Sequence, residues 1–508
     1  MSKKQQNTGA FKKDLRKFDI WALALGAIIG WGCFVMPGTA FLPKAGTSSI
    51  IGLLLGAVVM AIISFSYGYC IRKFPLSGGE FIYADASFGK VHAFACGWML
   101  ILGYWSLIPL NSTAIGLITR YLFPGIFQFG HLYTIAGWDV YLGEVLLSTC
   151  FIVVLGVMNV RGVKSAGWFQ TIVAVSLFGS VMICLIGTLI RVPFSEIKAN
   201  LSPFFAELTT NSEGLFDGVT SKGGIACIIA VACYAPYCFV GFDCIPQAAE
   251  EYKFSHKAAL GLMIAAILIG GVIYAAVVFV AAAGSSFAYE GLTWSEMMMQ
   301  NPGWAAGESV KAVLGYPGLF FLGVAMLCAV LSGMNAFYLA ASRLMYSMSY
   351  ADALPETFGE LHPKYGTPDK ATYFLMGLAV ICPWFGRTVL GWVVDMTCVG
   401  AAFGFTYTCA TATKMAKKEG LGFQTGISAV GTVLAAFFII LSFIPGSPGF
   451  LSVPSFIMLG VWVVMGVIFW MMRKNDFLHG RWEGVDVEHI LMTRMTEDGT
   501  IGSYNKNQ

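Results

Sequence analysis

The chain has 508 residues, of which 57% are hydrophobic and only 12% are charged. Ordinary soluble domains contain about 25% charged residues, so this composition excludes a soluble domain and indicates an integral membrane protein in a lipid bilayer. The net charge of +3 gives no indication of a nucleic acid partner. The 13 cysteines form no CxxC pair and no Cys/His cluster at zinc spacing, so we expect no metal and no cofactor.

The first 19 residues are polar and basic, and an apolar segment follows from Ile20 to about Pro43. That segment is long enough to cross a bilayer, which takes about 20 helical residues. Gly26, Gly30 and Gly32 lie at its centre, where each glycine weakens a helix by about 1 kcal/mol. A helix interrupted there leaves backbone groups unpaired at membrane depth, which is typical of transporter substrate sites. The alternative is close helix packing, because small residues four apart let backbones approach.

Further apolar segments predict an all-α integral membrane protein with about twelve transmembrane helices. The expected divisions are a cytoplasmic segment at 1–19, a ten-helix transporter core at 20–412, helices eleven and twelve within 413–472, and a cytoplasmic tail at 473–508. The least regular of the predicted spans is the short one at 371–386. The spans after the first are 48–71, 91–122, 140–160, 166–191, 223–250, 257–284, 309–346, 371–386, 389–412, 425–446 and 451–472.

The distribution of positive charge predicts the orientation in the cell membrane. An even number of spans places both termini on one side, and most of the 31 Lys and Arg residues fall on that side. The positive-inside rule therefore places both termini in the cytoplasm. The basic residues expected on the other side are Lys44, Arg120, Arg191, Lys198, Lys222, Lys311 and Arg387.

The sixth predicted span contains a second unusual pattern, with Pro236 and Pro246 on either side of Gly241 and Asp243. Proline removes a backbone donor and clashes with the preceding turn, so this helix should also be interrupted. Spans one and six are five passes apart, and five passes invert the orientation of a repeat. The pattern therefore predicts a 5+5 inverted repeat with discontinuous helices 1 and 6, whose matched interruptions mark a binding site.

Several motifs, taken in chain order, resemble the amino acid–polyamine–organocation permeases, a superfamily with the leucine-transporter fold. The resemblance extends over about residues 15–475. The combination is specific for the family and does not identify the substrate. The motifs are the first-span glycines at 26–32, the Pro-x-x-Gly-Gly loop at 74–83, and the segments 159–164, 239–243, 249–251, 342–346, 353–355 and 366–368.

The resemblance implies a secondary active transporter that moves a small-molecule substrate, an amino acid, by alternating access. Spans 1, 2, 6 and 7 would rock against spans 3, 4, 8 and 9. In this family the substrate carboxylate meets backbone amides at the first break, and the ammonium meets carbonyls of both breaks. The substrate-binding residues implied in this chain are Ile28, Gly30, Trp31, Gly32, Cys33, Tyr237, Val240 and Gly241.

Trp31 departs from the family, which usually has a small residue between these glycines. An indole here would narrow or cover the carboxylate end, offer a π face to a cation, or pack against a neighbouring helix. The π face leaves room for an alternative substrate, an organic amine or polyamine. Tyr237 and Phe239 match gating or substrate-contacting aromatics of the family, and the alternative for both is packing. Asn111 in span three would reach the substrate or bond a neighbouring helix.

Acidic and basic residues within or beside the spans are candidate gating groups. Asp243 is the acid nearest the expected site, and the family often has an acid here that is tied to gating or proton sensing. Its alternative role is to cap the local helix break. Glu251 and Arg343 are expected on the cytoplasmic side, as an inner gate or as solvated loop charges. Glu144 and Asp395 lie nearer the span ends and are weaker candidates.

The sequence leaves the coupling ion, Na+ or H+, open, along with simple exchange. Some proton-coupled members of the family carry a lysine in span five, but the corresponding stretch 174–178 contains none. Ser332 in span eight and Ser176 in span five are the candidate ion ligands. We do not expect this protein to be an enzyme, because its sequence shows no nucleophile–base spacing and no phosphate loop. The alternative of another class is a non-transporting receptor or scaffold, which would gain nothing from two broken helices.

Overall fold

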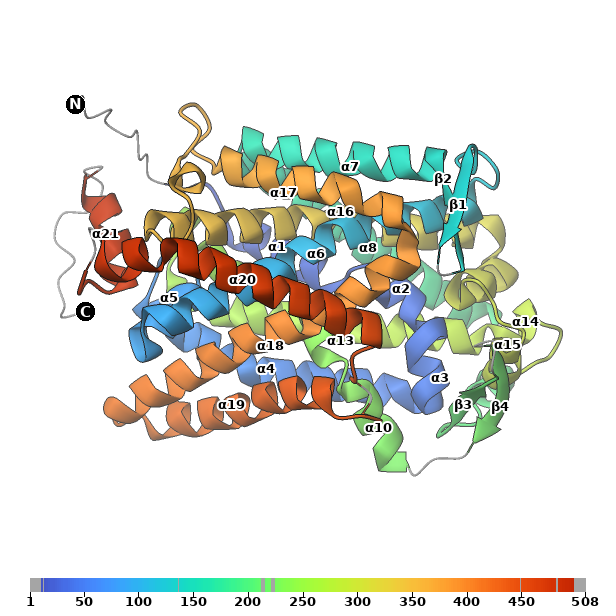
Figure 1. Ribbon diagram of the computed structural model, residues 1–508. Helices are drawn as coiled ribbons and strands as arrows, with labels where there is room; N and C mark the ends of the chain where they lie inside the picture. The colour runs from blue at the N-terminus through green and yellow to red at the C-terminus, as the bar shows by residue number, and fades with distance from the viewer. Residues whose placement is uncertain are drawn as a thin grey trace.

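The computed structural model describes residues 11, 13–135, 137–211, 215–220, 224–447, 449–480 and 483–497. The predicted N-terminal segment and the end of the predicted tail therefore lie partly outside the described residues. Long helices run side by side through the body of the molecule, and the first and the last described residues lie at the same end of it, which we call the end with the termini (Figure 1). Eight helices of the described part are long and apolar enough to cross a membrane.

The first predicted span is interrupted at residues 29–31, within the glycine-rich stretch. Ile29 leaves the helical region with φ −89° and ψ 79°. Prolines then disturb the second half of the span, because they lack the N–H that a continuous α-helix uses. The elements are α1 (Lys17–Ile28), α2 (Gly32–Met36), a π-helical turn η1 (Pro37–Phe41), α3 (Leu42–Ala45) and a 3-10 turn η2 (Gly46–Ser48).

The sixth predicted span is interrupted as well. Pro236 lies in the first turn of its middle helix, where a missing N–H is tolerated. Gly241 has a φ of +126°, a backbone conformation that favours glycine. The elements are α10 (Gly224–Ala232), α11 (Ala235–Phe239), α12 (Cys244–Gln247) and the 3-10 turns η3 (Ala249–Glu251) and η4 (His256–Ala258).

Mostly continuous helices form the rest of the body. Within α16, Gly315 has a φ of +72° and changes the direction of the helix. The short predicted span at 371–386 is α17 followed by a 3-10 turn, and α18 begins directly after it. The bounds are α4 (Ser49–Lys73), α6 (Lys90–Leu122), α7 (Leu142–Arg161), α8 (Val163–Arg191), α13 (Ala259–Ala283), α16 (Ala305–Tyr350), α17 (Asp369–Ile381), η6 (Cys382–Phe385), α18 (Gly386–Lys418), α19 (Gly422–Phe443) and α20 (Val453–His479).

Short elements gather at the two ends of the helical body (Figure 1). The end away from the termini carries two antiparallel hairpins, which the sequence interpretation did not predict, and three short helices. These are β1 (His131–Ile135) with β2 (Trp138–Tyr141), β3 (Glu207–Thr210) with β4 (Phe216–Thr220), and α9 (Phe194–Asn200), α14 (Ser285–Ala288) and α15 (Trp294–Met299). The end with the termini carries α5 (Glu80–Phe88), η5 (Glu356–Gly359) and α21 (Val487–Glu497).

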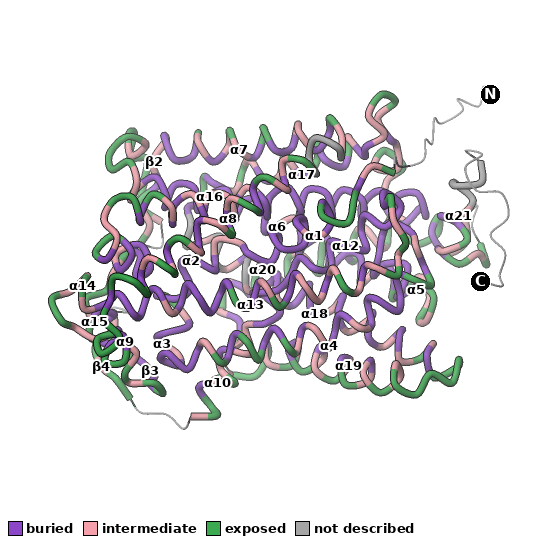
Figure 2. The backbone as a smooth tube through the Cα atoms, turned by 180° about the vertical axis from the view of Figure 1, so that it is seen from behind, coloured by how far each residue is buried: buried purple, intermediate pink, exposed green. Residues whose placement is uncertain are grey.

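Burial divides the helices into a central group and an outer group (Figure 2). Almost all of α1 is buried, and α16 is buried at every residue from Ser332 to Tyr350. Outer helices instead expose apolar side chains, as α20 does with Val461, Val464 and Met472. A surface of this kind would favour aggregation in water and suits the hydrocarbon of a bilayer.

The chain after the last predicted span contains a helix that the sequence interpretation did not predict. α20 continues to His479, and α21 then packs against α5. Val487, Ile490 and Leu491 are fully buried, and the Val487 N–H donates to the Asp85 carboxylate at 2.7 Å. The segment predicted as a separate polar tail therefore includes a docked helix, because three apolar residues on one face outweigh its polar composition.

Candidate functional site

The two interrupted spans touch each other through their backbones. A Cβ on Gly241 would collide with the Ala27 side chain and would lie 2.9 Å from the Ile28 nitrogen. A Cβ on Gly270 of α13 would lie 2.7 Å from Ile28 Cγ2. Since real Cβ atoms do not come so close, Gly241 allows the break in the sixth span to sit directly on the end of α1, and Gly270 allows α13 to do the same.

Several backbone groups at the two breaks have no partner among the described contacts. The Ile28 carbonyl accepts from the Gly30 N–H at 3.1 Å and from the Tyr274 hydroxyl at 3.3 Å. Among the described contacts, no hydrogen bond is made by the Gly32 N–H, by the Ile29 carbonyl or by the Val240 carbonyl. Backbone donors and acceptors from the two breaks are therefore left for a ligand. Ile28, an expected ammonium ligand, already has its carbonyl engaged.

Trp31 and Tyr237 form an aromatic pair at the first break. Their ring centroids lie 6.4 Å apart in an edge-to-face arrangement. Trp31 is half-buried, whereas Gly32 and Cys33 beside it are buried. A Cβ on Gly32 would lie 3.1 Å from Tyr237 Cε1, so this glycine borders the pair. The structure therefore brings together Trp31, Gly32 and Tyr237, three of the expected substrate-binding residues.

Phe239 and Cys33 are two further candidates at the breaks. Phe239 is fully buried and its ring packs against Tyr274 at a centroid distance of 5.8 Å, which is the packing alternative stated for it. Cys33 is also fully buried, and its backbone N–H, the group expected to meet the substrate carboxylate, donates to the Gly30 carbonyl at 3.2 Å.

Asn111 bridges α6 to the first break. Its Nδ2 donates to the Leu107 carbonyl at 2.7 Å, and its Oδ1 accepts from the Trp31 N–H at 3.5 Å. A Cβ on Gly30 would lie 3.4 Å from the same oxygen. Asn111 thus contacts the break itself, in agreement with the expectation that it bonds a neighbouring helix.

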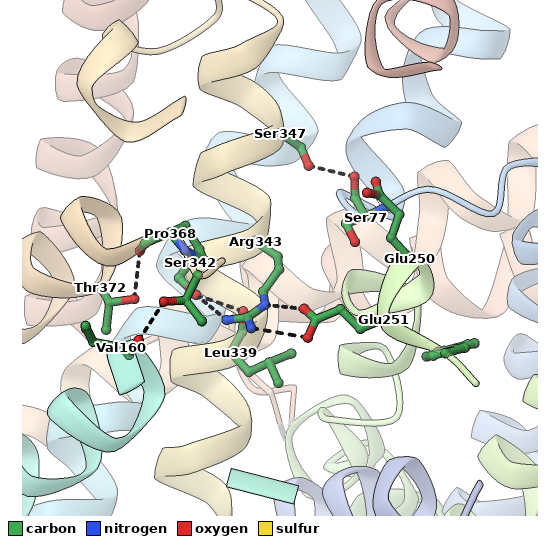
Figure 3. A network of polar contacts seen from close by, with 12 residues as sticks. Ser77, Val160, Glu250, Glu251, Leu339, Ser342, Arg343, Ser347, Pro368 and Thr372 are labelled. Carbon is green, nitrogen blue, oxygen red and sulfur yellow. Dashed lines mark hydrogen bonds and ion pairs between the residues drawn. The ribbon is translucent and has the colours of Figure 1, made fainter. Parts of the chain in front are cut away.

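The end of the molecule that carries the termini is closed by buried polar contacts (Figure 3). Arg343 Nε donates to Glu251 Oε1 at 2.8 Å, and both side chains are 1% exposed. Ser347 donates to the Ser77 carbonyl at 2.6 Å, and the Ser77 N–H donates to Glu250 at 2.9 Å. These contacts join α16 to the end of the sixth span and to the loop before α5. Glu251 and Arg343 are therefore a buried ion pair and not solvated loop charges, which was the alternative stated for them.

The N-terminal segment adds a second layer to this closure. Leu15 pairs with Tyr252 in a parallel bridge, and the Leu15 N–H donates to the Glu251 carbonyl at 3.0 Å. The Phe11 ring lies 5.8 Å from the Arg343 guanidinium carbon. The chain just before α1 is therefore tied to the chain just after the sixth span.

Comparison with known proteins decides the family of this chain. Residues 15–470 match the family model described as amino acid permease. The chain belongs to the amino acid permease family. It is therefore a helical, multi-pass membrane protein from a family of transporters and not of enzymes.

Three relatives of this permease illustrate the range of the family. It is 25% identical to the methylthioribose transporter of Bacillus subtilis, over 94% of this chain and 96% of that protein. It is 24% identical to the branched-chain amino acid permease BcaP of the same organism, over 92% and 95%. It is 25% identical to the serine/threonine exchanger SteT, also from Bacillus subtilis, over 73% and 76%.

A buried polar chain beside the site was missed by the sequence interpretation. Gln170 on α8 donates to the Ala22 carbonyl at 3.0 Å and also bonds Ser332. Asn335 donates to Gln170 at 3.0 Å, and Asn159 donates to Asn335 at 2.9 Å. Ser332, a candidate ion ligand, is thus engaged by a neutral amide. Ser176 is half-buried, and no contact between the two serines is found among the described residues.

The other predicted acids have distinct surroundings. Glu144 forms a two-pronged ion pair with Arg120, at 2.6 and 2.8 Å, close to the β1–β2 hairpin. Asp395 accepts from Ser455 at 2.7 Å. Asp243 is fully buried and accepts from the Tyr104 hydroxyl at 2.9 Å. Asp243 lies within the interrupted sixth span itself, and its link to Tyr104 had no signal in the sequence.

Proposed function

We propose that this permease moves an amino acid across the cell membrane by alternating access. In this proposal twelve spans, the first ten arranged as a 5+5 inverted repeat, cross the membrane with both termini in the cytoplasm. The substrate lies between the two helix breaks. The excess of positive charge on the side of the termini supports this orientation.

The contact between the two breaks is the observation that carries the proposal. Interrupted backbone at membrane depth is tolerated where it lines a cavity or is buried in protein. Here it leaves the Gly32 N–H and the Val240 carbonyl without a described partner. The amide can receive the substrate carboxylate and the carbonyl can receive the ammonium, so a neutral pocket can hold a zwitterion.

The closed cytoplasmic end supports the alternating part of the mechanism. The Arg343–Glu251 pair joins α16 to the end of the sixth span, and both groups are buried. An opening toward the cytoplasm must separate them, so we assign them the role of inner gate. The structure then corresponds to a form of the transporter that is closed on the cytoplasmic side.

A permease for an organic amine is the second candidate, favoured by one observation. Trp31 is half-buried beside Tyr237, and the pair offers aromatic faces to a cation without a carboxylate. The similarity to a methylthioribose transporter shows in addition that the family is not restricted to amino acids.

A thermal-shift screen of the purified protein tests these alternatives. The compounds are amino acids, their amides, decarboxylated amines and methylthioribose. A ligand at 100 times its Kd adds about 2.7 kcal/mol to the free energy of unfolding. Stabilisation by amino acids that disappears on amidation is the expected result. Stabilisation by amines alone would favour the second candidate. Failure of proteoliposomes to take up any radiolabelled amino acid would contradict the proposal.

A further inference from the structure

Glu80 is a carboxylic acid enclosed at the junction of four segments. It is the first residue of α5, and its exposed fraction is 0%. Tyr67 of α4 donates to Oε1 at 2.9 Å, and Gln247 of α12 donates to Oε2 at 2.6 Å. The Tyr104 hydroxyl of α6 lies 3.4 Å from Oε1. The side chain is therefore held in place by neutral donors.

A second buried acid shares one of these donors. The Tyr104 hydroxyl lies 2.9 Å from Asp243 Oδ2, so it stands between the two carboxyl groups. Asp243 Oδ1 accepts from the Gly241 N–H at 2.6 Å. Tyr104 has a single hydroxyl proton and can donate it to one carboxylate at a time.

The described contacts of the two acids include no counter-charge. Within the described contacts, neither carboxylate forms an ion pair with Lys, Arg or His. The neighbouring element α18 is apolar where it meets Tyr67, since its Phe405 ring packs against the Tyr67 ring. Two carboxylates in such a site cannot both ionise without a large cost. Burial and the neighbouring Asp243 carboxylate raise the pKa of Glu80 above its usual range. The titratable groups facing Glu80 are Tyr67 and Cys70 on α4, Tyr83 on α5, Cys96 and Tyr104 on α6, and Asp243 and Cys244 in the sixth span.

We propose that Glu80 and Asp243 share one proton through the Tyr104 hydroxyl, and that this proton is the coupling ion of transport. The inference rests on the transport function proposed above and names its coupling ion. When Glu80 gives its proton to the Tyr104 oxygen, Tyr104 passes its own proton to Asp243. The phenol is unchanged, and the negative charge moves from Asp243 to Glu80.

The position of the pair connects the proton to both moving parts of the site. Asp243 holds the N–H of Gly241, the glycine that rests on Ala27 and Ile28 at the first break. Glu80 holds Gln247, which lies shortly before the inner-gate residue Glu251. A charge on one acid or the other therefore alters the contacts of the substrate site or those of the cytoplasmic closure.

Infrared spectroscopy of the purified protein tests the site without any substrate. We expect a protonated-carboxyl band that disappears as the pH is raised and that is missing in Glu80→Gln. The matched control is Glu356→Gln, which changes an exposed loop acid and should leave the band in place. Size-exclusion profiles confirm that each variant is folded. A band that persists unchanged in Glu80→Gln would overturn the proton site.

Accumulation in proteoliposomes tests the coupling, with a radiolabelled mixture of L-amino acids as the probe. A gradient of one pH unit should support up to tenfold accumulation in the unmodified protein if one proton accompanies each substrate. The ratio should fall to about one in Glu80→Gln and in Tyr104→Phe. Tenfold accumulation in Glu80→Gln would overturn the coupling. Absence of any uptake by the unmodified protein, with the infrared band present, would instead contradict the transport function and leave the proton site standing.

Discussion

Gly241 is the residue on which the contact between the two interrupted spans depends. We predict that Gly241→Ala abolishes uptake and lowers the free energy of unfolding by roughly 1–3 kcal/mol. An alanine at φ +126° is strained, and its methyl group would meet Ala27. Uptake by proteoliposomes and thermal unfolding in detergent measure the two effects.

Gly261 provides the matched control for this substitution. It lies on an exposed face of α13, and a Cβ there would meet nothing within 4 Å. Gly261→Ala should leave both uptake and unfolding nearly unchanged. If Gly241→Ala behaves like Gly261→Ala, the close backbone contact is not required for transport.

Single residues divide into those that the sequence could identify and those that it could not. Glycine and proline interrupt a helix by local chemistry, so the breaks near Gly30 and Gly241 were predictable. Glu80 and Gln170 have no local sequence signature, because their roles depend on hydrogen-bond partners in other helices. Trp31 was singled out as a departure from the family, and its pairing with Tyr237 required coordinates.

At the scale of helices, the Arg343–Glu251 pair joins α16 to the end of the sixth span. We predict that Arg343→Met destabilises the closed form by roughly 3–5 kcal/mol, because it leaves the Glu251 carboxylate buried without its cation. The double variant Arg343→Met/Glu251→Gln should recover most of that loss. Thermal unfolding of the single and double variants gives the coupling between the two residues.

The exposed pair of Lys370 with Glu360 serves as the comparison for the buried one. Both side chains are more than 40% exposed, so Lys370→Met should cost less than about 1 kcal/mol. Equal losses of unfolding free energy for Arg343→Met and Lys370→Met would show that burial does not strengthen the contribution of the gate pair to stability.

The docking of α21 on α5 predicts a pH dependence. Burial raises the pKa of Asp85 to about 6, although the Val487 N–H favours its ionised form. The folded state therefore binds a proton more tightly than the unfolded state, whose aspartate titrates near 4. Stability should fall as the pH rises from about 4 to about 6. In Asp85→Asn this slope should disappear in thermal unfolding measured against pH, and a slope that is unchanged would contradict the assignment.

Short elements were the part of the architecture that the sequence did not predict. The β1–β2 and β3–β4 hairpins have strands of four or five residues, too short for a periodic pattern. α21 was hidden by polar composition, and its three buried apolar residues become evident once α5 is in place. The long helices were predictable from hydropathy, because apolar residues extend along the whole length of each helix, on its buried and on its exposed faces.

For the whole molecule, the testable quantity is its orientation in the membrane. We predict that a cysteine at Asp217, in β4, reacts with a membrane-impermeant thiol reagent in intact cells. A cysteine at Glu356, at the end that carries the termini, should react only after the membrane is permeabilised. Both positions are exposed. The protein without either substitution gives the background from its native cysteines, and the reverse pattern of labelling would place the termini outside.

The overall architecture was more accessible to sequence reasoning than the site was. Composition and hydropathy identified a helical membrane protein, and the ordered motifs identified the family that the comparison with known proteins confirms. The number of spans and the inverted repeat remain predictions. They concern the path of the chain through a bilayer, and eight helices of the described part are long and apolar enough to cross one.

The glycine at position 26 gives α1 a mechanical property. A Cβ there would collide with Ser332 Oγ and lie 2.5 Å from Gln170 Nε2, so the backbone of α1 rests on the side chains of Ser332 and Gln170 at this point. The contact lies much closer to the first break than to the other end of α1. At 1.5 Å per residue, the arm toward Lys17 is about 14 Å long and the arm toward Ile28 is about 3 Å. If α1 tilts about Gly26, a small displacement at the first break becomes a movement several times larger at the Lys17 end of the helix.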